Sequence, residues 1–67
     1  MDVRTMLLDG KYSETLEKYG KEKVRGELIE MIFENQLADK ALPAAKALEY
    51  RDLTHIAEVA IKYDTYW

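Results

Sequence analysis

The chain has 67 residues and no cysteine, and its 13 acidic and 10 basic side chains give a formal net charge of −3 at pH 7. This length predicts a single domain over residues 1–67. The absence of cysteine excludes disulfides and thiolate metal sites, and the acidic balance disfavours binding to nucleic-acid phosphates. A hydrophobic fraction of 48% and a charged fraction of 34% are typical of a folded domain.

No signal peptide is expected at residues 1–4, because no basic segment leads into an apolar run. Uninterrupted apolar runs reach three residues at most, so no transmembrane segment is expected. We therefore expect a cytoplasmic protein.

Apolar residues recur at helical spacing and hardly ever alternate, which predicts an all-α bundle of four or five short helices. Asp2 is expected to cap a first helix that ends at Gly10. A second helix should run from about Ser13 to Gly20, where it closes or bends. Apolar side chains at one-turn intervals support these two helices at Val3, Met6, Leu7, Tyr12, Leu16 and Tyr19.

The longest predicted helix covers residues 21–40 and should be central. Its apolar positions form two adjacent stripes, a wider arc than a surface helix needs. Gly26 interrupts this helix and indicates either a close helix crossing or a tolerated exposed glycine, and the sequence favours neither.

The only proline, Pro43, predicts a helix boundary, because proline suits a first turn and disfavours helix in the residue before it. A fourth helix is expected from Pro43 to about Tyr50, and Asp52 should cap a fifth that reaches Tyr63. Residues 43–63 would then form a helical hairpin against the central helix. The predicted buried residues are Leu28, Ile32, Phe33, Leu48, Ile56 and Ala60, and Phe33→Ala should cost roughly 3–5 kcal/mol.

Residues 8–19 contain Gly10, Tyr12, Leu16 and Tyr19 at a spacing that resembles the joint between the two helices of a tetratricopeptide repeat. Thr15 stands where that family prefers Ala. No second copy follows at the 34-residue period, although residues 12–19 and 53–60 share a looser spacing that suits a HEAT-like period. The resemblance covers about a fifth of the chain and implies helical hairpins that bind proteins. It transfers no site residues.

Catalytic and metal-binding patterns are weak in this sequence. His55 is the only histidine, and it lies between the acids Asp52 and Glu58, which more simply cap or solvate a helix. Carboxylates follow one side of the central helix at Glu27, Glu30 and Glu34, yet a di-metal carboxylate site would also require a Glu-x-x-His pair. No histidine base is expected to serve Ser13 or Thr54, so nucleophilic catalysis is without support. We therefore expect no enzymatic activity, no cofactor and no metal.

Residues 44–63 also allow a helix-turn-helix reading, which makes a DNA-binding regulator the alternative function. Ala45, Leu48 and Ile56 suit its packing positions. Its recognition helix would present Thr54, His55, Glu58 and Lys62, of which only Lys62 is a fixed cation.

Aromatic residues cluster near the C-terminus, where Tyr63, Tyr66 and Trp67 lie within five residues. Tyr50 is expected to lie close to them across the hairpin. These four residues either form a partner-binding surface or cover the core of a very small domain. Residues 28–33 are apolar except at Glu30, more than short helices can cover. The sequence therefore predicts a non-enzymatic protein-protein interaction module that binds protein, including itself as a homodimer.

Overall fold

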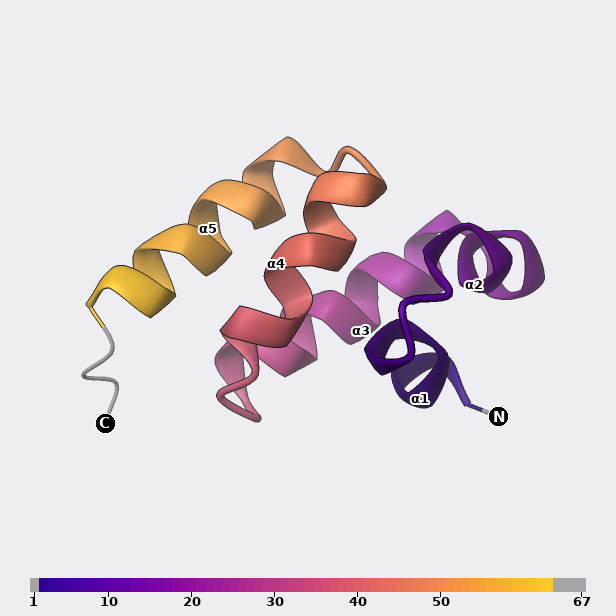
Figure 1. Cartoon of the computed structure of the whole chain (residues 1–67), viewed down its shortest axis with the longest axis horizontal. Helices are drawn as coiled ribbons and strands as arrows, with labels where there is room; N and C mark the ends of the chain where they lie inside the picture. The colour runs from indigo at the N-terminus through magenta and orange to yellow at the C-terminus, as the bar shows by residue number, and fades with distance from the viewer. Residues whose placement is uncertain (1, 64–67) are drawn as a thin grey trace.

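Five helices follow one another along residues 2–63, which are the residues that the computed structural model describes (Figure 1). No strand occurs in that part of the chain, so the predicted all-α bundle is confirmed. None of these helices combines the length and the apolar character needed to cross a membrane. The helices are α1 (Val3–Leu8), α2 (Tyr12–Tyr19), α3 (Lys21–Phe33), α4 (Ala38–Ala47) and α5 (Arg51–Lys62).

The ends of α1 and α2 are set by local sequence, as predicted. The Asp2 carboxylate accepts a hydrogen bond from the Thr5 amide at 2.8 Å, and hydrogen bonding to Thr5, first with its side chain and then with this amide, lowers the pKa of Asp2. Gly10 ends α1 with φ +82°, and the Gly10 and Lys11 amides donate to the carbonyls of the last turn, an arrangement that suits glycine. Gly20 separates α2 from α3 with φ 90° and ψ 161°, a conformation that side chains with a Cβ rarely adopt.

The expected helix over residues 21–40 is in fact two helices. α3 ends at Phe33, and a turn over residues 34–37 leads into α4. In this turn Gln36 takes φ +55°, and the Leu37 amide donates to the Met31 carbonyl at 2.7 Å. The sequence does not indicate the turn between α3 and α4, because the turn contains neither glycine nor proline and the apolar spacing continues into α4.

Pro43 lies inside α4, so the predicted helix boundary at this proline is wrong. An interior proline forgoes one backbone hydrogen bond and costs about 3 kcal/mol. Here the ring is exposed, while the other side of α4 is packed at its small residues. Burial of these alanines offsets the proline penalty; they are Ala38, Ala41, Ala44 and Ala45.

α4 ends in a turn that closes around Glu49, which has φ +61°. The Glu49 amide donates to the Lys46 carbonyl at 3.1 Å, and the Tyr50 amide donates to the Ala45 carbonyl at 2.9 Å. This pair of bonds is the Schellman motif, in which glycine usually occupies the position of Glu49. α5 then begins at Arg51 without a side-chain cap, so the predicted capping role of Asp52 is wrong.

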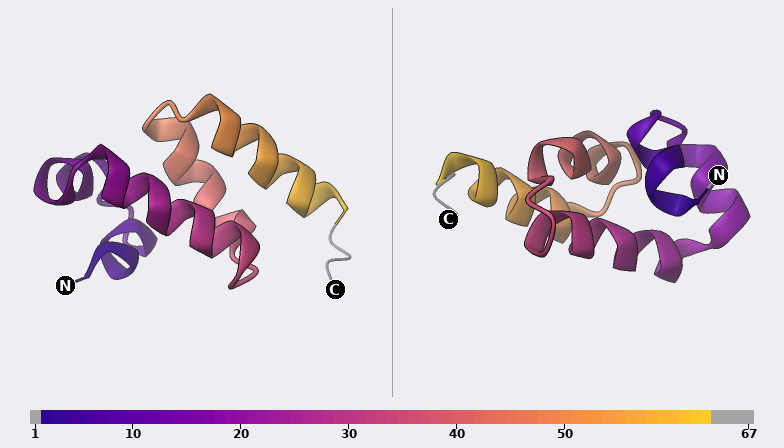
Figure 2. Two further views of the ribbon diagram at one scale, coloured as in Figure 1. Left: turned by 180° about the vertical axis from the view of Figure 1, so that it is seen from behind. Right: turned by 90° about the horizontal axis from the view of Figure 1, so that it is seen from below.

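The core lies where α3 and α4 cross, and α5 packs chiefly against α4 (Figure 2). Leu28 and Ile32 of α3 are fully buried, as predicted. Leu48, Ile56 and Ala60 are only partly buried and pack against the edge of the core. Leu48 lies in the turn after α4, and Ile56 and Ala60 lie on α5 at the edge of its packing against α4, so the prediction that these three residues are buried is wrong.

Phe33 was predicted to be buried, but 60% of its surface is exposed. It is the last residue of α3, and it follows Ile29 by one turn along the side turned away from Leu28. The predicted loss of roughly 3–5 kcal/mol for Phe33→Ala is therefore too large. Gly26 has no atom within 4 Å of the position that a Cβ would occupy, so it is a tolerated glycine and not a close helix crossing.

Candidate interaction surface

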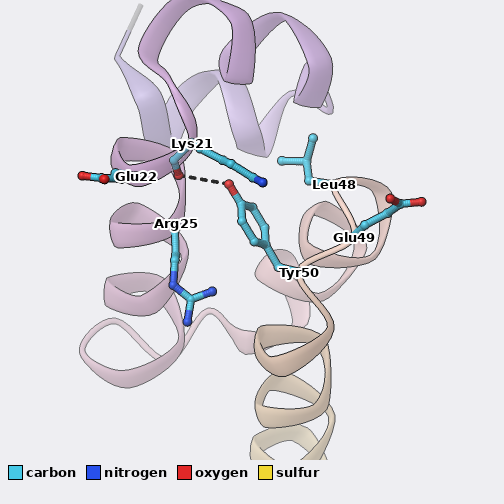
Figure 3. Close-up of a pocket in the computed structure, with 6 residues that line it drawn as sticks. All are labelled: Lys21, Glu22, Arg25, Leu48, Glu49 and Tyr50. Atoms are coloured by element: carbon cyan, nitrogen blue, oxygen red, sulfur yellow. Dashed lines mark hydrogen bonds between the residues drawn. The ribbon is translucent and has the colours of Figure 1, made fainter.

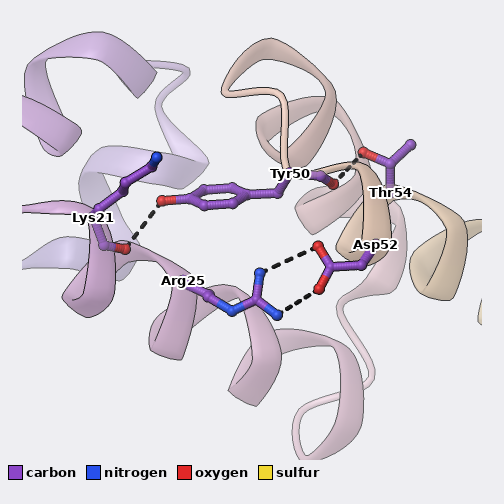
Figure 4. A network of polar contacts seen from close by, with 5 residues as sticks. All are labelled: Lys21, Arg25, Tyr50, Asp52 and Thr54. Atoms are coloured by element: carbon purple, nitrogen blue, oxygen red, sulfur yellow. Dashed lines mark hydrogen bonds and ion pairs between the residues drawn. The ribbon is translucent and has the colours of Figure 1, made fainter.

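Tyr50 connects the turn after α4 to the start of α3 (Figure 4). Only 7% of its surface is exposed, and its hydroxyl donates to the Lys21 carbonyl at 3.0 Å. The Tyr50 carbonyl in turn accepts a hydrogen bond from the Thr54 hydroxyl at 2.9 Å. Burial raises the pKa of the Tyr50 phenol, although the nearby Arg25 opposes this effect. Tyr50 therefore has an internal role as an attachment between α3 and the α4–α5 hairpin.

Arg25 forms a second attachment beside Tyr50. Its guanidinium donates to both carboxylate oxygens of Asp52, at 3.2 Å and 2.5 Å, and its carbon lies 5.9 Å from the centre of the Tyr50 ring. These hydrogen bonds lower the pKa of Asp52 and raise that of Arg25. Both side chains are partly exposed, so the ion pair contributes little to stability. Its two parallel bonds instead orient α5 relative to α3.

A pocket of about 370 Å³ opens beside these attachments (Figure 3). The Tyr50 hydroxyl points toward the Lys21 carbonyl, and the carboxylates of Glu22 and Glu49 point outward on opposite sides. Two cations and two anions line the pocket together with Leu48, so no net charge selects a ligand. Tyr50 and Arg25 are both already hydrogen-bonded to other residues of the chain, so neither is available in the pocket as a catalytic group.

The residues weighed for catalysis or metal binding are dispersed. His55 is exposed on α5. Glu27 pairs with Arg4, with 2.6 Å between Oε2 and Nε, and this bond raises the pKa of Arg4. Glu30 and Glu34 are exposed. Within residues 2–63, no three His, Asp or Glu side chains are placed to hold a metal ion together.

The predicted proximity of Tyr50 to Tyr63 is wrong. Tyr50 and Tyr63 flank the 12 residues of α5, which at 1.5 Å per residue separates them by roughly 18 Å. Tyr63 is 60% exposed, and the Lys62 ammonium lies 5.5 Å from the centre of its ring. Tyr66 and Trp67 lie outside the described residues.

The Arg25–Asp52 pair marks the sides of α3 and α5 that face each other. On α3, Ile29 follows Arg25 by four residues and Phe33 by eight, which keeps both near that side. On α5, the residues four, seven and eleven positions after Asp52 are Ile56, Val59 and Tyr63, and this spacing keeps them near the side of α5 that faces α3. Both helices run toward the same end of the molecule from this pair (Figures 1 and 2). We call these residues the α3–α5 apolar surface: Ile29, Phe33, Ile56, Val59 and Tyr63.

The outer part of this surface is exposed to solvent. Phe33 and Tyr63 are each 60% exposed, and Val59 is 39% exposed. Ile29 and Ile56 are partly buried and join this exposed part to the core. The only other large apolar side chain with comparable exposure in residues 2–63 is Leu8, at 47% on α1. Three exposed apolar side chains on one side of two helices mark a contact surface.

Tyr63 was named from the sequence, but Phe33 and Val59 were missed as surface residues. Phe33 was assigned to the core because it belongs to the second apolar stripe of the helix predicted over residues 21–40, which was expected to be packed on two sides. A signal was present in the seven-residue spacing from Asp52 to Val59, which puts Val59 outside the buried stripe of Leu53 and Ala57.

Comparisons with models of protein families, with curated proteins and with solved structures found no match to this chain. The resemblance of residues 8–19 to a tetratricopeptide joint stays a prediction.

Proposed function

We propose that the protein is a non-enzymatic protein-protein interaction module of the cytoplasm, and that the α3–α5 apolar surface is its contact site. The observation that carries this proposal is the 60% exposure of Phe33 at the open end of that surface. Burial of a phenylalanine side chain is worth roughly 1.5–3 kcal/mol. A side chain of this type left in solvent, with Val59 and Tyr63 on the neighbouring helix, favours a partner that covers all three.

The arrangement suits a helical partner. Two helices diverging from the Arg25–Asp52 pair present apolar side chains in two rows, and an apolar helix face contacts such rows at one-turn intervals. Phe33 and Tyr63 provide large aromatic area with few rotatable bonds, as the residues that dominate interface energies do. The tetratricopeptide-like spacing at Gly10 and Tyr12 points to the same class of function.

A pull-down with matched variants tests this proposal. Phe33 is the last residue of α3 and Leu8 the last residue of α1, and both are exposed. Lysine at either position ends a helix favourably, so Phe33→Lys and Leu8→Lys are comparable changes. Proteins retained by the wild type and by Leu8→Lys should be lost with Phe33→Lys. Retention of the same proteins by a folded Phe33→Lys variant would show that the surface is not the contact site.

The alternative is a DNA-binding regulator that uses residues 44–63. In its favour, α4 and α5 are joined by a short turn over residues 48–50, and His55 and Lys62 are exposed on α5. Against it, Thr54 is engaged with the Tyr50 carbonyl and Glu58 is exposed beside His55. An electrophoretic mobility shift at low salt separates the two functions, because even nonspecific DNA binding is visible there.

A further inference from the structure

We propose that the partner of the α3–α5 apolar surface is a second copy of this chain, with α3 of each copy lying on α5 of the other. This inference rests on the proposed function and names its partner. The charges that border the surface on its two sides identify this partner.

An acidic row borders the surface along α3. Glu30 precedes Phe33 by three residues on α3, and Glu34 follows Glu30 by four at the C-cap of the helix, so the two carboxylates lie on one side of α3. Both are exposed, and within residues 2–63 neither carboxylate has an ion-pair partner. Glu27 and the exposed Lys23 continue this side of α3 toward its N-terminus, where Arg4 pairs with Glu27, so the acidic part of the row that borders the surface is Glu30 and Glu34.

A basic row borders the opposite edge, along α5, with Lys62 and Arg51 as its two fixed cations and His55 between them. His55 precedes Val59 by four residues and Lys62 follows it by three, so both lie on the outer side of Val59. Arg51 extends this row by one more turn toward the N-terminus of α5, and all three side chains are exposed. Glu58 belongs to the next row round the helix, away from the apolar surface.

Two-fold symmetry distinguishes the ways in which two such surfaces can meet. An axis that runs along the helices places α3 of one copy over α5 of the other, so that each acidic row faces a basic row. An axis that crosses the helices places acidic row on acidic row and basic row on basic row, which is repulsive. The first arrangement also brings the Phe33 end of each copy to the Val59 and Tyr63 end of its partner, because α3 and α5 point the same way (Figure 2).

This pattern favours a second copy over an unrelated protein. A partner for the surface must carry apolar side chains between a basic row and an acidic row, and the chain itself provides that complement twice in one symmetric contact. Complementary charge at the edge of an interface mainly sets its orientation and specificity, while the apolar centre provides affinity. Phe33 and Tyr63 therefore supply the affinity of the dimer, and the two rows supply its register.

Charge exchange between the rows tests both the partner and the arrangement. Sedimentation equilibrium over about 1–200 μM at low salt, where charge is weakly screened, should show the wild type as a dimer at the upper end. Glu30→Lys and Lys62→Glu should each weaken the dimer about tenfold or more, because each creates two like-charge contacts across the axis. An equimolar mixture of the two variants should recover the wild-type affinity, since both contacts are then attractive, and so should the double variant.

Glu17→Lys and Lys18→Glu on α2 are the matched controls, because both side chains are exposed and lie away from the surface. They should leave the dimer unchanged. A monomer at 200 μM would overturn the inference, and so would a dimer that tolerates both single exchanges. If the dimer is absent but the Phe33→Lys variant still fails to retain, in the pull-down, proteins that the Leu8→Lys control retains, then the surface is a contact site for another partner. If that variant loses none of these proteins, the proposed function fails as well.

Discussion

Replacement of Gly26 by alanine should stabilise the protein, because this glycine occupies a helix interior without any need for it. Its backbone is helical within α3, and an added Cβ would meet no atom within 4 Å. Alanine is favoured over glycine in a helix by about 1 kcal/mol. A chain of this length unfolds with an entropy near 140 cal/mol/K, at about 2.1 cal/mol/K per residue. The melting temperature should therefore rise by about 7 °C.

Gly20→Ala is the matched control, because the same substitution meets a different backbone. Gly20 has φ 90° and ψ 161°, where a Cβ is strained by about 1–3 kcal/mol. Its melting temperature should fall by about 7–20 °C. Circular dichroism melts of the wild type and both variants at one low concentration measure these shifts. A Gly26→Ala variant that melts at or below the wild-type temperature would refute the reasoning and indicate that a neighbour needs this space.

Three further predictions follow from burial and charge. Leu28→Ala should cost about 2–5 kcal/mol because Leu28 is fully buried, whereas Phe33→Ala should cost less than about 1 kcal/mol in the dilute protein; urea titrations compare the two, and equal losses would contradict the exposure of Phe33. The lowered pKa of Asp52 means that its contribution is present above pH about 4 and is lost as pH falls through the folded value; acid melts should therefore show a shallower decline for Asp52→Asn than for the wild type. Because the pKa of Tyr50 is raised, its neutral phenol contributes to folding stability below pH about 10, and this contribution is lost as pH rises above it. The Tyr50→Phe variant should therefore lose less stability than the wild type between pH 9 and 11. An equal loss of stability with pH in both proteins would show that burial does not hold the phenol neutral.

The helix ends that the sequence predicted correctly are those set by one residue and its immediate neighbours. Asp2 caps α1 through its own side chain, and Gly10 and Gly20 adopt backbone angles that few other residues tolerate. The wrongly predicted ends depend on distant contacts. Gln36 and Glu49 turn the chain with positive φ although neither is a turn residue, because the packing of α4 against its neighbours compensates for the strain.

Pro43 shows the same competition. Its local preference is to begin a helix, yet four buried alanines keep α4 helical on both sides of it. The candidate surface was also only partly predictable. Tyr63 was named from the sequence either as a partner-binding aromatic or as a cover of the core, but the exposure of Phe33 follows from the early end of α3, which the apolar periodicity did not reveal.

Both hydrogen-bonded attachments of α5 to α3 lie at the start of α5, so the other end of α5 can open locally. Tyr50 precedes α5 and Asp52 is in its first turn, so the hydrogen bonds to Lys21 and Arg25 hold one end only. Beyond Ala57, no residue of α5 is fully buried before the helix ends at Lys62. Amide hydrogens near Ala57 should therefore exchange with solvent on the timescale of global unfolding, and those near Ile61 should exchange much sooner. We expect the far end of α5 to open and reclose while the rest of the bundle stays folded.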